Sequence, residues 1–468
     1  MVKEELKWCE ITLSDVVKNG NRLEASVFDI DVQRALKDIE SSSFPSRPLI
    51  GANGFVQNAH YGDRLKRNYV PKIAKGAIGF LGSAEMLDFQ PRPQKFMLND
   101  ERVEKLRVKE GMLLISRSGT IGNMAYVNHT LSKYLVSEHA IRLECKEYPG
   151  YVYAFLKTET GQNLIQSKNF GSVVQEIEPD DIASIPVPDA NDSLKKQIDL
   201  LVKKAYELRD EANTLIDEAM VLLQESLKLP EVEDFDENDV LKLNSFDVKL
   251  SELNNRFDAS YHVPLVREIE RVIKEQAKEV IPLGDKRLSK EIILPGRFKR
   301  VYVEKGHGTT FIGGKQLWQI DPTNKKYLSN IKHGDLISNK LELHNLMTLI
   351  TCSGTIGKVA MVGKHWEGWA ANQHIIRVVP ASDEVAGYIN LFLSTECGRQ
   401  LIIRHTYGAV IDEIDDTHVA EIPIPIISDK KLIKKINDNV LQANELRYKS
   451  YIMEMDAIEK MNNEVIFT

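Results

Sequence analysis

The chain has 468 residues, of which 43% are hydrophobic and 28% are charged, a composition typical of globular proteins. This length exceeds what one ordinary hydrophobic core supports, so we expect two or three domains. The net charge of −7 argues at first against a nucleic-acid partner. No apolar run approaches the ~18–20 residues that a bilayer requires, and the N-terminus lacks the basic and apolar regions of a secretion signal. The sequence therefore predicts a cytoplasmic protein that does not enter a membrane.

The cysteines are scattered along the chain. Cys9, Cys145, Cys352 and Cys397 form no C-x-x-C pair and have no patterned histidine nearby. We therefore expect free thiols in a reducing compartment and no metal site.

The first segment with a distinctive pattern mixes basic and aromatic residues. Arg64, Lys66 and Arg67 alternate with Tyr61 and Tyr69 in the sequence YGDRLKRNY. Such mixtures are typical of nucleic-acid-binding surfaces, although a charged edge strand that blocks aggregation has the same composition. Both interpretations stay open.

Two short strands with a glycine turn between them follow. The run 112–117 (MLLISR) is apolar and β-branched, leads into Ser-Gly-Thr-Ile-Gly, and precedes a second strand at 123–127. The run 346–351 (LMTLIT) has the same pattern and precedes a second strand at 358–362. The turn either brings backbone N–H groups to a DNA phosphate or only needs glycine for its positive φ. Arg117 is a candidate for a bidentate contact to guanine or a phosphate clamp, and a solvated surface arginine is the alternative.

The first half ends in a proline-containing exit and a long helix. Asp180 and Asp181 should cap a short helix, and the Ile-Pro-Val-Pro that follows must be extended. Apolar residues then alternate at spacings of four and three, which predicts a heptad seam about 42 Å long at ~1.5 Å per residue. The seam residues are Leu194, Ile198, Leu201, Ala205, Leu208, Ala212, Leu215, Ala219 and Leu222.

An acidic stretch at 229–247 reads as the connector to a second half that repeats the first. The blocks NRLEAS, LLISRSGTIG, GSVVQEIEPDDIASIPVP and ELR return in the same order as NRFDAS, TLITCSGTIG, GAVIDEIDDTHVAEIPIP and ELR, at a nearly constant offset along the chain. Similar blocks in the same order indicate a tandem duplication. Residues 40–110 and 275–345 diverge strongly, as we expect of two domains that recognise different target sequences.

The second half carries its own basic candidates. Arg297, Lys299 and Arg300 alternate with Phe298 and Tyr302 in PGRFKRVY. Weaker candidates of the same kind are Lys315, Lys340 and His344. Position 352, which matches Arg117, is a cysteine, so the shared scaffold does not require an arginine there.

The second long helix has a weaker seam. Asn439 either sets the register of the helix pair or marks an exposed stretch. Alanine recurs along both seams, which favours close antiparallel pairing. The second seam runs through Leu432, Ile436, Asn439, Ala443, Leu446, Ser450, Met453 and Ala457.

The charge distribution reverses the first impression that the total charge gives. Residues 44–120 contain 13 Lys and Arg against 7 Asp and Glu, and residues 284–363 contain 13 against 6. The remaining chain therefore carries −7 − 13 = −20. Because local charge on a binding face attracts phosphates, the two basic islands favour a nucleic-acid partner.

Motifs of catalysis are missing from the sequence. Gly308–Gly313 is followed by Gly314 and Lys315, so it fails the P-loop pattern, and no Asn-Pro-Pro motif of an amino-methyltransferase is present. We expect no catalytic residue, no metal and no bound cofactor.

The Ser-Gly-Thr-Ile-Gly hairpins, the 171–188 and 408–425 blocks that end in Ile-Pro-x-Pro, and the long helices after them occur twice in the same order. In this combination the chain resembles the specificity subunits of type I restriction–modification systems over nearly its full length. The resemblance implies two target-recognition domains held apart by an antiparallel helical pair with pseudo-two-fold symmetry. It also implies helices that bind two methyltransferase subunits and, in the full complex, motor-nuclease subunits. S-adenosylmethionine would be bound by the methyltransferase, which methylates adenine N6.

We therefore predict an α+β fold and a non-catalytic, sequence-specific subunit for a bipartite site in double-stranded DNA. The alternative is a coiled-coil adaptor with two β-rich protein-binding domains. The predicted parts are domain 1 (1–190), helix 1 (191–228), the connector (229–250), domain 2 (251–428) and helix 2 (429–468). Predicted DNA contacts are Arg64, Lys66, Arg67, Arg117, Arg297, Lys299, Arg300, Lys315 and Lys340. Predicted spacer and partner contacts are Leu201, Leu208, Leu215, Leu222, Ile436, Leu446 and Met453.

Overall fold

The computed structural model of the chain describes residues 10–18, 28–169, 175–232, 246–253, 256–408 and 410–468. It has the mixed helix and sheet composition expected from the sequence, with β-rich regions and long helices. The chain forms two compact units: unit 1 is Met1–Asp210 with Lys449–Thr468, and unit 2 is Glu211–Tyr448. This division cuts through both long helices, whereas the predicted boundaries set each helix apart as a separate part.

Unit 1 is built on two sheets and one short strand pair. The larger sheet has the order β2-β8-β5-β6, the smaller one β4-β3-β7, and β1 pairs with β9. The strand bounds are β1 Ser46–Pro48, β2 Val56–His60, β3 Ala77–Leu81, β4 Lys95–Leu98, β5 Leu113–Ser116, β6 Met124–Tyr126, β7 Leu135–Val136, β8 Ala140–Cys145 and β9 Pro186–Pro188.

The helices of unit 1 pack around the larger sheet and form one hydrophobic core with it. This core also takes in Ala457, Met461, Val465 and Ile466 from the C-terminal end of the chain. The helical bounds are α1 Leu13–Lys18, α2 Ile30–Ser41, η2 Glu85–Leu87, η3 Glu101–Leu106, α3 His129–Ser132, α4 Pro149–Lys157, α5 Glu159–Gln166, α6 Pro179–Ala183, α7 Asp192–Leu227 (shared with unit 2) and η10 Asn462–Ile466.

Unit 2 has the same sheet plan, with one additional strand, β12, at the edge of the smaller sheet. Its sheets have the orders β11-β18-β15-β16 and β12-β14-β13-β17, and β10 pairs with β19. The strand bounds are β10 Glu279–Pro282, β11 Ser289–Ile293, β12 Tyr302–Val303, β13 Gly308–Ile312, β14 Lys326–Ser329, β15 Thr348–Thr351, β16 Val359–Met361, β17 Ala370–Ala371, β18 Ile375–Pro380 and β19 Pro423–Ile426.

The helices of unit 2 follow the order of those in unit 1, with α9, α11, α12 and α13 in the places of α2, α4, α5 and α6. The helical bounds are η5 Leu250–Glu252, η6 Ala259–His262, α9 Pro264–Gln276, η7 Gly314–Gln316, α10 Asn330–Leu336, η8 Ile337–Leu341, η9 Lys364–Trp366, α11 Asp383–Ser394, α12 Glu396–Ile403, α13 Asp416–Ala420 and α14 Lys430–Met461, whose last turns belong to unit 1.

The local sequence signals explain these elements. The predicted strands at 112–117 and 346–351 are β5 and β15, and the prolines of the two exits lie in β9 and β19. The acidic pairs cap short helices as expected: the Asp181 side chain accepts a hydrogen bond from the Glu178 backbone N–H, and Asp415 is the N-cap of α13.

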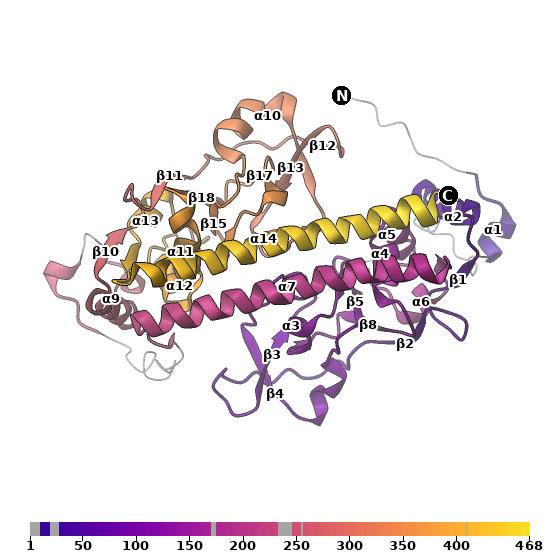
Figure 1. Ribbon diagram of the computed structural model, residues 1–468, viewed down its shortest axis with the longest axis horizontal. Coiled ribbons are helices and arrows are strands. Elements are labelled where there is room, and N and C mark those ends of the chain that lie inside the picture. Colours follow the sequence, from indigo (N-terminus) through magenta and orange to yellow (C-terminus); the bar gives the residue numbers. More distant parts are fainter. Residues whose placement is uncertain (1–9, 19–27, 170–174, 233–245, 254–255, 409) are drawn as a thin grey trace. The chain divides into compact units, whose positions relative to one another are not determined.

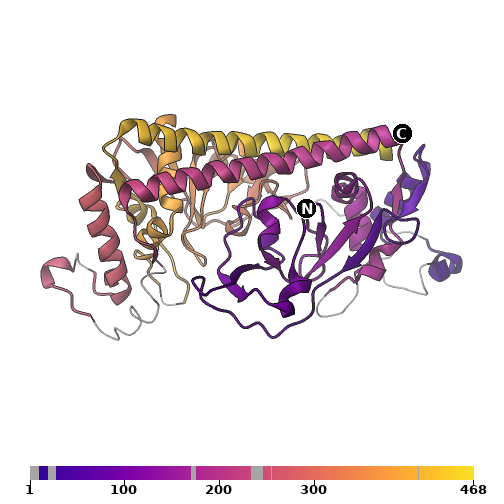
Figure 2. The same ribbon diagram turned by 60° about the horizontal axis from the view of Figure 1, so that its bottom comes forward.

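In each unit, half of α7 lies beside half of α14, with opposite chain directions (Figures 1 and 2). In unit 1, Arg209 near the middle of α7 donates a 2.7 Å hydrogen bond to Ser450, while Gln197 and Leu201 near its start line one groove with Asn463 and Glu464. In unit 2, Arg447 Nη2 lies 3.3 Å from Asn213 Oδ1. The predicted antiparallel arrangement is therefore present within each unit.

The heptad seam on α7 is only partly correct. Ala205, Ala212 and Ala219 are fully buried, but Leu215 and Leu222 are half-buried. Their neighbours Ile216 and Leu223 take the buried positions instead. A straight helix drifts by about 20° per heptad against a strict seven-residue repeat, so the buried stripe moves by one residue along the helix. Of the other predicted spacer residues, Leu208, Ile436 and Leu446 are buried, and Leu201 and Met453 are half-buried.

Within the described residues, Cys145, Cys352 and Cys397 are free thiols, as predicted, and Cys9 lies outside the described part. Most of the predicted acidic connector also lies outside it. None of the described helices is long and apolar enough to cross a membrane.

Candidate nucleic-acid interface

The two glycine turns adopt the backbone conformation that the structural interpretation requires. Gly119 and Gly122 have φ of 75° and 88°, and Gly354 and Gly357 have φ of 74° and 83°. A Cβ added at Gly119 or Gly354 would meet no other atom within 4 Å. The tip of each turn is therefore open, and glycine is needed there for the backbone conformation rather than for space. A contact between the turns and DNA stays a prediction.

In both units the turn lies against the Glu-Ile block. In unit 1, Ser118 forms a β-bridge with Glu176, and the Ile177 N–H donates to the Arg117 carbonyl at 2.9 Å. In unit 2, Ser353 forms a β-bridge with Glu413, and the backbone N–H of the next residue, at position 414, donates to the carbonyl of residue 352 at 3.0 Å. The two sequence blocks that the halves share most clearly are thus one structural feature.

The basic clusters lie at the same edge as the turns. Arg64 Nη2 is 3.6 Å from the Glu176 carboxylate, and its side chain is 69% exposed. Arg297 Nη2 is 2.8 Å from the Glu413 carboxylate, and its side chain is 79% exposed. Since Glu176 and Glu413 are the residues that bridge to the turns, each unit brings an exposed arginine and an open glycine turn to one edge.

The other predicted basic residues divide into exposed and partly enclosed ones. Lys66 and Lys299 are exposed next to these arginines, and so are Lys315 in η7 and Lys340 in η8. His344 is paired with Glu367 at 3.0 Å. Their proposed contacts with DNA remain predictions.

Arg67 and Arg300 bind inward. The Arg67 guanidinium lies 5.2 Å from the centre of the Phe80 ring and 2.6 Å from the Glu138 carboxylate. Burial raises the pKa of Glu138, but a backbone hydrogen bond and Arg67 outweigh it and hold the pKa below its usual range. Arg300 repeats this arrangement with Phe311 and Gln373.

The interpretation of Arg117 as a solvated surface arginine is wrong. Its side chain is 1% exposed, and its guanidinium forms ion pairs with Glu176 at 3.1 Å and with Glu178. It also lies 4.3 Å over the Tyr61 ring. In this conformation Arg117 cannot reach a base, because its side chain is buried, its Nη2 is paired with two carboxylates and Tyr61 covers one face of the guanidinium. Its counterpart Cys352 is also buried, and burial raises the pKa of that thiol to about 12.

Sequence reasoning missed a pair of buried arginines. Arg142 in β8 and Arg377 in β18 are fully buried. Arg142 donates to the Leu106 and Val136 carbonyls at 3.1 and 2.5 Å, and Arg377 donates to the equivalent carbonyls of residues 341 and 371. Burial lowers the pKa of Arg142 to about 10 and that of Arg377 to about 9.

These arginines tie the smaller sheet and its neighbouring helical turn to the larger sheet, because β7 and η3 supply the carbonyls in unit 1 and β17 and η8 supply them in unit 2. The available signal was an arginine at the same place in two apolar strands, AIRLEC in the first half and IIRVVP in the second.

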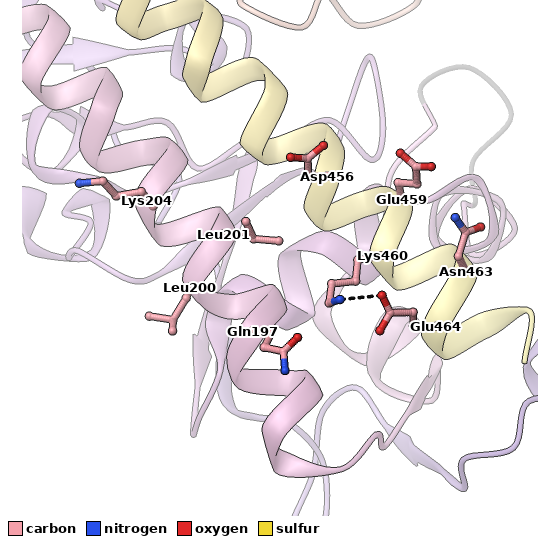
Figure 3. A pocket seen from close by; sticks show the side chains of 9 residues that line it. All are labelled: Gln197, Leu200, Leu201, Lys204, Asp456, Glu459, Lys460, Asn463 and Glu464. Carbon is pink, nitrogen blue, oxygen red and sulfur yellow. Dashed lines mark hydrogen bonds and ion pairs between the residues drawn. The ribbon is translucent and has the colours of Figure 1, made fainter.

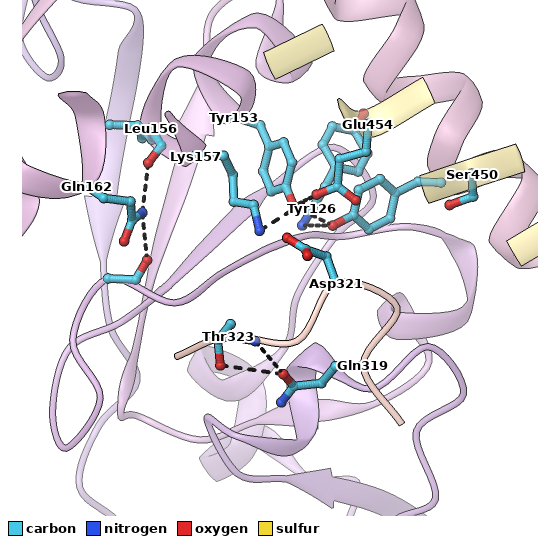
Figure 4. A network of polar contacts seen from close by, with 12 residues as sticks. Tyr126, Tyr153, Leu156, Lys157, Gln162, Gln319, Asp321, Thr323, Ser450 and Glu454 are labelled. Carbon is cyan, nitrogen blue, oxygen red and sulfur yellow. Dashed lines mark hydrogen bonds and ion pairs between the residues drawn. The ribbon is translucent and has the colours of Figure 1, made fainter. Parts of the chain in front are cut away.

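A second feature missed from the sequence is a buried polar network at the helix junction of unit 1 (Figure 4). Glu454 of α14 is 2% exposed and forms an ion pair with Arg209 of α7. The Tyr153 hydroxyl donates to Glu454 at 2.6 Å, and Lys157 Nζ lies 3.8 Å from its carboxylate. Burial raises the pKa of Glu454, but Arg209, Lys157 and Tyr153 outweigh it, so the pKa falls to about 2. The carboxylate is therefore ionised.

A groove of about 650 Å³ lies between the start of α7 and the last turns of α14 in unit 1 (Figure 3). Leu201, one of the predicted partner contacts, lies in it beside Leu200, which is 53% exposed. Polar residues of α14 and η10 form the opposite wall, where Lys460 pairs with Glu464 at 2.6 Å.

Across the residues that the structure describes, no group of three or more His, Cys, Asp or Glu side chains could hold a metal ion.

No family model and no curated protein sequence matches the chain. Several solved structures are similar to it. A type I restriction–modification system S subunit from M. genitalium has 14% identity and a TM-score of 0.34, with 88% of this chain and 98% of that chain covered. The HsdS subunit from Thermoanaerobacter tengcongensis has 12% identity and a TM-score of 0.28, with 87% and 93% covered. A structure reported for the complex assembly and conformational transition of the type I R-M system has 12% identity and a TM-score of 0.28, with 86% of this chain and 92% of that chain covered.

Proposed function

We propose that this chain is the non-catalytic specificity subunit of a type I restriction–modification system, and that it binds a bipartite target in double-stranded DNA. One observation carries the proposal. Two units with the same sheet plan each place an exposed arginine, Arg64 or Arg297, beside an open glycine turn. A duplicated binding edge suits a target with two parts.

The proposal assigns DNA contacts to both units. Arg64, Lys66 and Arg67 would act on one half-site, and Arg297, Lys299, Arg300, Lys315 and Lys340 on the other. Phosphate contacts would position the protein, and contacts to base edges would select the sequence. The long helices would act as the spacer that sets the gap between half-sites, for which one DNA turn of ~34–36 Å is the natural unit.

In this proposal, partner subunits catalyse the methylation. Methylating an adenine requires the base to be flipped out of the stack, and that would be done by two methyltransferase subunits that bind S-adenosylmethionine. Motor-nuclease subunits would join them in the full complex. The groove that contains Leu200 and Leu201 is the proposed contact for one methyltransferase, because it exposes apolar surface on a spacer helix.

Salt dependence of DNA binding tests the proposal. The full-length chain is titrated with a fluorescent duplex between 50 and 300 mM KCl. A DNA-binding subunit should show log K falling linearly with log salt, by about 0.9 for each phosphate contacted. Absence of salt-dependent binding would instead favour the adaptor alternative.

A second experiment tests the partner contact. Leu200→Asp should reduce co-purification with the methyltransferase subunit of the same system and leave DNA binding by the isolated chain unchanged. Lys196→Asp, an exposed substitution on the same helix, is the control. Equal retention of the methyltransferase by both variants would remove this groove from the proposal.

A further inference from the structure

The two basic clusters are copies of one motif. Residues 64–70 have the sequence RLKRNYV and residues 297–303 have RFKRVYV, which share Arg-x-Lys-Arg-x-Tyr-Val at corresponding places in the two halves. The motif lies inside the regions where the two halves otherwise differ most. A match of this length there needs an explanation that applies to both units.

The backbone around the motif is also repeated. Val70 forms a β-bridge with Phe96 of β4, and Val303 pairs with Tyr327 of β14. The motif therefore lines the outer edge of the smaller sheet in each unit. Across that sheet, Lys95 lies directly opposite Phe80, and Lys326 lies directly opposite Phe311.

The side chains form the same stack in both units. In unit 1, the Tyr69 and Phe80 rings are 6.1 Å apart and inclined by 56°, with Lys95 Nζ 5.3 Å from the Tyr69 ring and Arg67 over Phe80. In unit 2 the corresponding rings are 6.1 Å apart and inclined by 55°, with the lysine 5.0 Å from the tyrosine ring. The corresponding residues are Tyr302, Phe311, Lys326 and Arg300.

Each stack has a buried side and an exposed side. Phe80 and Phe311 are almost fully buried, whereas Tyr69 and Tyr302 are about two-fifths exposed. Three cations are exposed at equivalent places in both units, namely Arg64, Lys66 and Lys95 in unit 1 and Arg297, Lys299 and Lys326 in unit 2. Arg67 is also exposed in unit 1, whereas its counterpart Arg300 is half-buried. A rigid aromatic support therefore presents three exposed cations at equivalent places in both units.

We propose that this motif, with the lysine of the neighbouring strand, is a phosphate clamp that holds the DNA backbone in the same way at both half-sites. Two units that read different bases have no reason to share base-reading residues, whereas the sugar-phosphate backbone is the same at every site. Base reading then belongs to residues that differ. Lys315 is one of these, since its counterpart in the first half is Ala84. This inference rests on the proposed DNA-binding function and assigns roles within it.

The test uses the full-length chain and two 40-base-pair duplexes of unrelated sequence. The variants are Arg64→Gln with Lys66→Gln, Arg297→Gln with Lys299→Gln, and all four together. Each double variant should reduce the slope of log K against log salt by about 2, and the fourfold variant by about 4, since each phosphate contact contributes about 0.9. Both duplexes should respond equally.

Two controls separate a clamp from a general charge effect. Lys431→Gln with Lys435→Gln removes the same charge from exposed positions of α14, and should leave the slope unchanged. Arg64→Lys with Lys66→Arg keeps the charge and should also keep the slope. Thermal melting of all variants should match the wild type, because the substituted side chains are exposed.

The outcomes distinguish the two proposals. A wild type that binds DNA with a steep slope, and motif variants that keep that slope, would overturn the clamp and leave the DNA-binding function in place. A loss confined to one of the two duplexes would show base reading and would also overturn the clamp. A wild type with no salt-dependent binding would overturn the function, and the clamp with it.

Discussion

The helix junctions of the two units have the same backbone contacts but different buried side chains. In unit 1, the backbone N–H of Gly150 donates to Asp199 at 2.7 Å, and in unit 2 the N–H of Gly387 donates to Asn437 at 2.8 Å. These acceptors lie at matching places on α7 and α14. A Cβ at either glycine would come within 3 Å of the helix backbone, so close approach of helix and domain is common to both units.

The buried side chains of the two units differ at a second pair of matching positions. In unit 1, Glu454 accepts a hydrogen bond from Tyr153 and forms an ion pair with Arg209. Glu454 corresponds to Ile216 when the two long helices are aligned. Tyr153 corresponds to Asn390 in the same alignment of the halves. Unit 2 therefore buries an isoleucine and an amide where unit 1 buries a carboxylate and a phenol. The close approach of helix and domain is therefore the same in both units, while the side chains buried at this second pair of positions differ.

The largest expected effect comes from removing the carboxylate of unit 1. Glu454→Leu leaves the buried Arg209 guanidinium without its counter-ion, and breaking such a pair costs about 3–5 kcal/mol of unfolding free energy. In hydrogen exchange, the backbone amides of residues 195–210 and 449–461 should lose protection before those of residues 264–276 of α9. Urea unfolding measures its size.

Two matched variants sharpen this result. Arg209→Met combined with Glu454→Leu should recover most of the lost stability, because replacing both members of a buried pair by apolar residues is often neutral. Ile216→Val, at the equivalent place in unit 2, should cost only about 0.5–1.5 kcal/mol. If the double variant is as unstable as Glu454→Leu, the ion pair is not the reason for the loss.

The next largest expected effect is a pH dependence of stability that arises in unit 2 and not in unit 1. Burial lowers the pKa of His405 in unit 2 to about 3, and Arg404, His418 and Arg256 add to this, whereas Asp415 opposes it. Position 168, the equivalent in unit 1, is a lysine. Because the folded state disfavours the protonated imidazole, its stability contribution is complete above the ordinary pKa of about 6.5 and is lost as pH falls toward 3.

Unit 2 should therefore lose roughly 3 kcal/mol between pH 7.5 and 4.5 from this group alone, at about 1.36 kcal/mol for each pKa unit. Urea unfolding of the wild type and of His405→Phe across this range measures the effect. The variant should have a flatter pH profile. Parallel profiles would mean that the pKa of His405 is the same in the folded and the unfolded protein.

The smallest effect tests what the units have in common. Gly119→Ala and Gly354→Ala should each destabilise the protein by about 1–2 kcal/mol, because both glycines have φ near 75° and only the backbone conformation disfavours a side chain there. Thermal melting of the two variants measures this. A loss at one turn and none at the other would show that the turns are not equivalent.

The sequence predicted the features that depend on local patterns. The strands at 112–117 and 346–351, the proline exits and the long helices follow from side-chain periodicity and proline chemistry, and they lie where expected. The seam on α7 was wrong at Leu215 and Leu222, since heptad counting ignores both the drift of a straight helix and the second face that packs on each domain.

The candidate site was harder to predict because burial depends on partners far away in sequence. Arg117 looked exposed next to a turn, but Glu176 and Glu178 enclose it from a much later segment of the chain. Conversely, Lys95 and Lys326 lie on separate strands from the basic motif and join it only through sheet pairing. The motif itself was visible in the sequence, but only by aligning the two halves inside the regions where they diverge.

Selection from a random pool of 50-base-pair duplexes tests the central claim most directly. The full-length chain is incubated with the pool at moderate salt, and the bound duplexes are sequenced over successive rounds. Two groups of fixed bases separated by a gap of constant length and free sequence are expected. One uninterrupted motif, or no enrichment at all, would contradict the account.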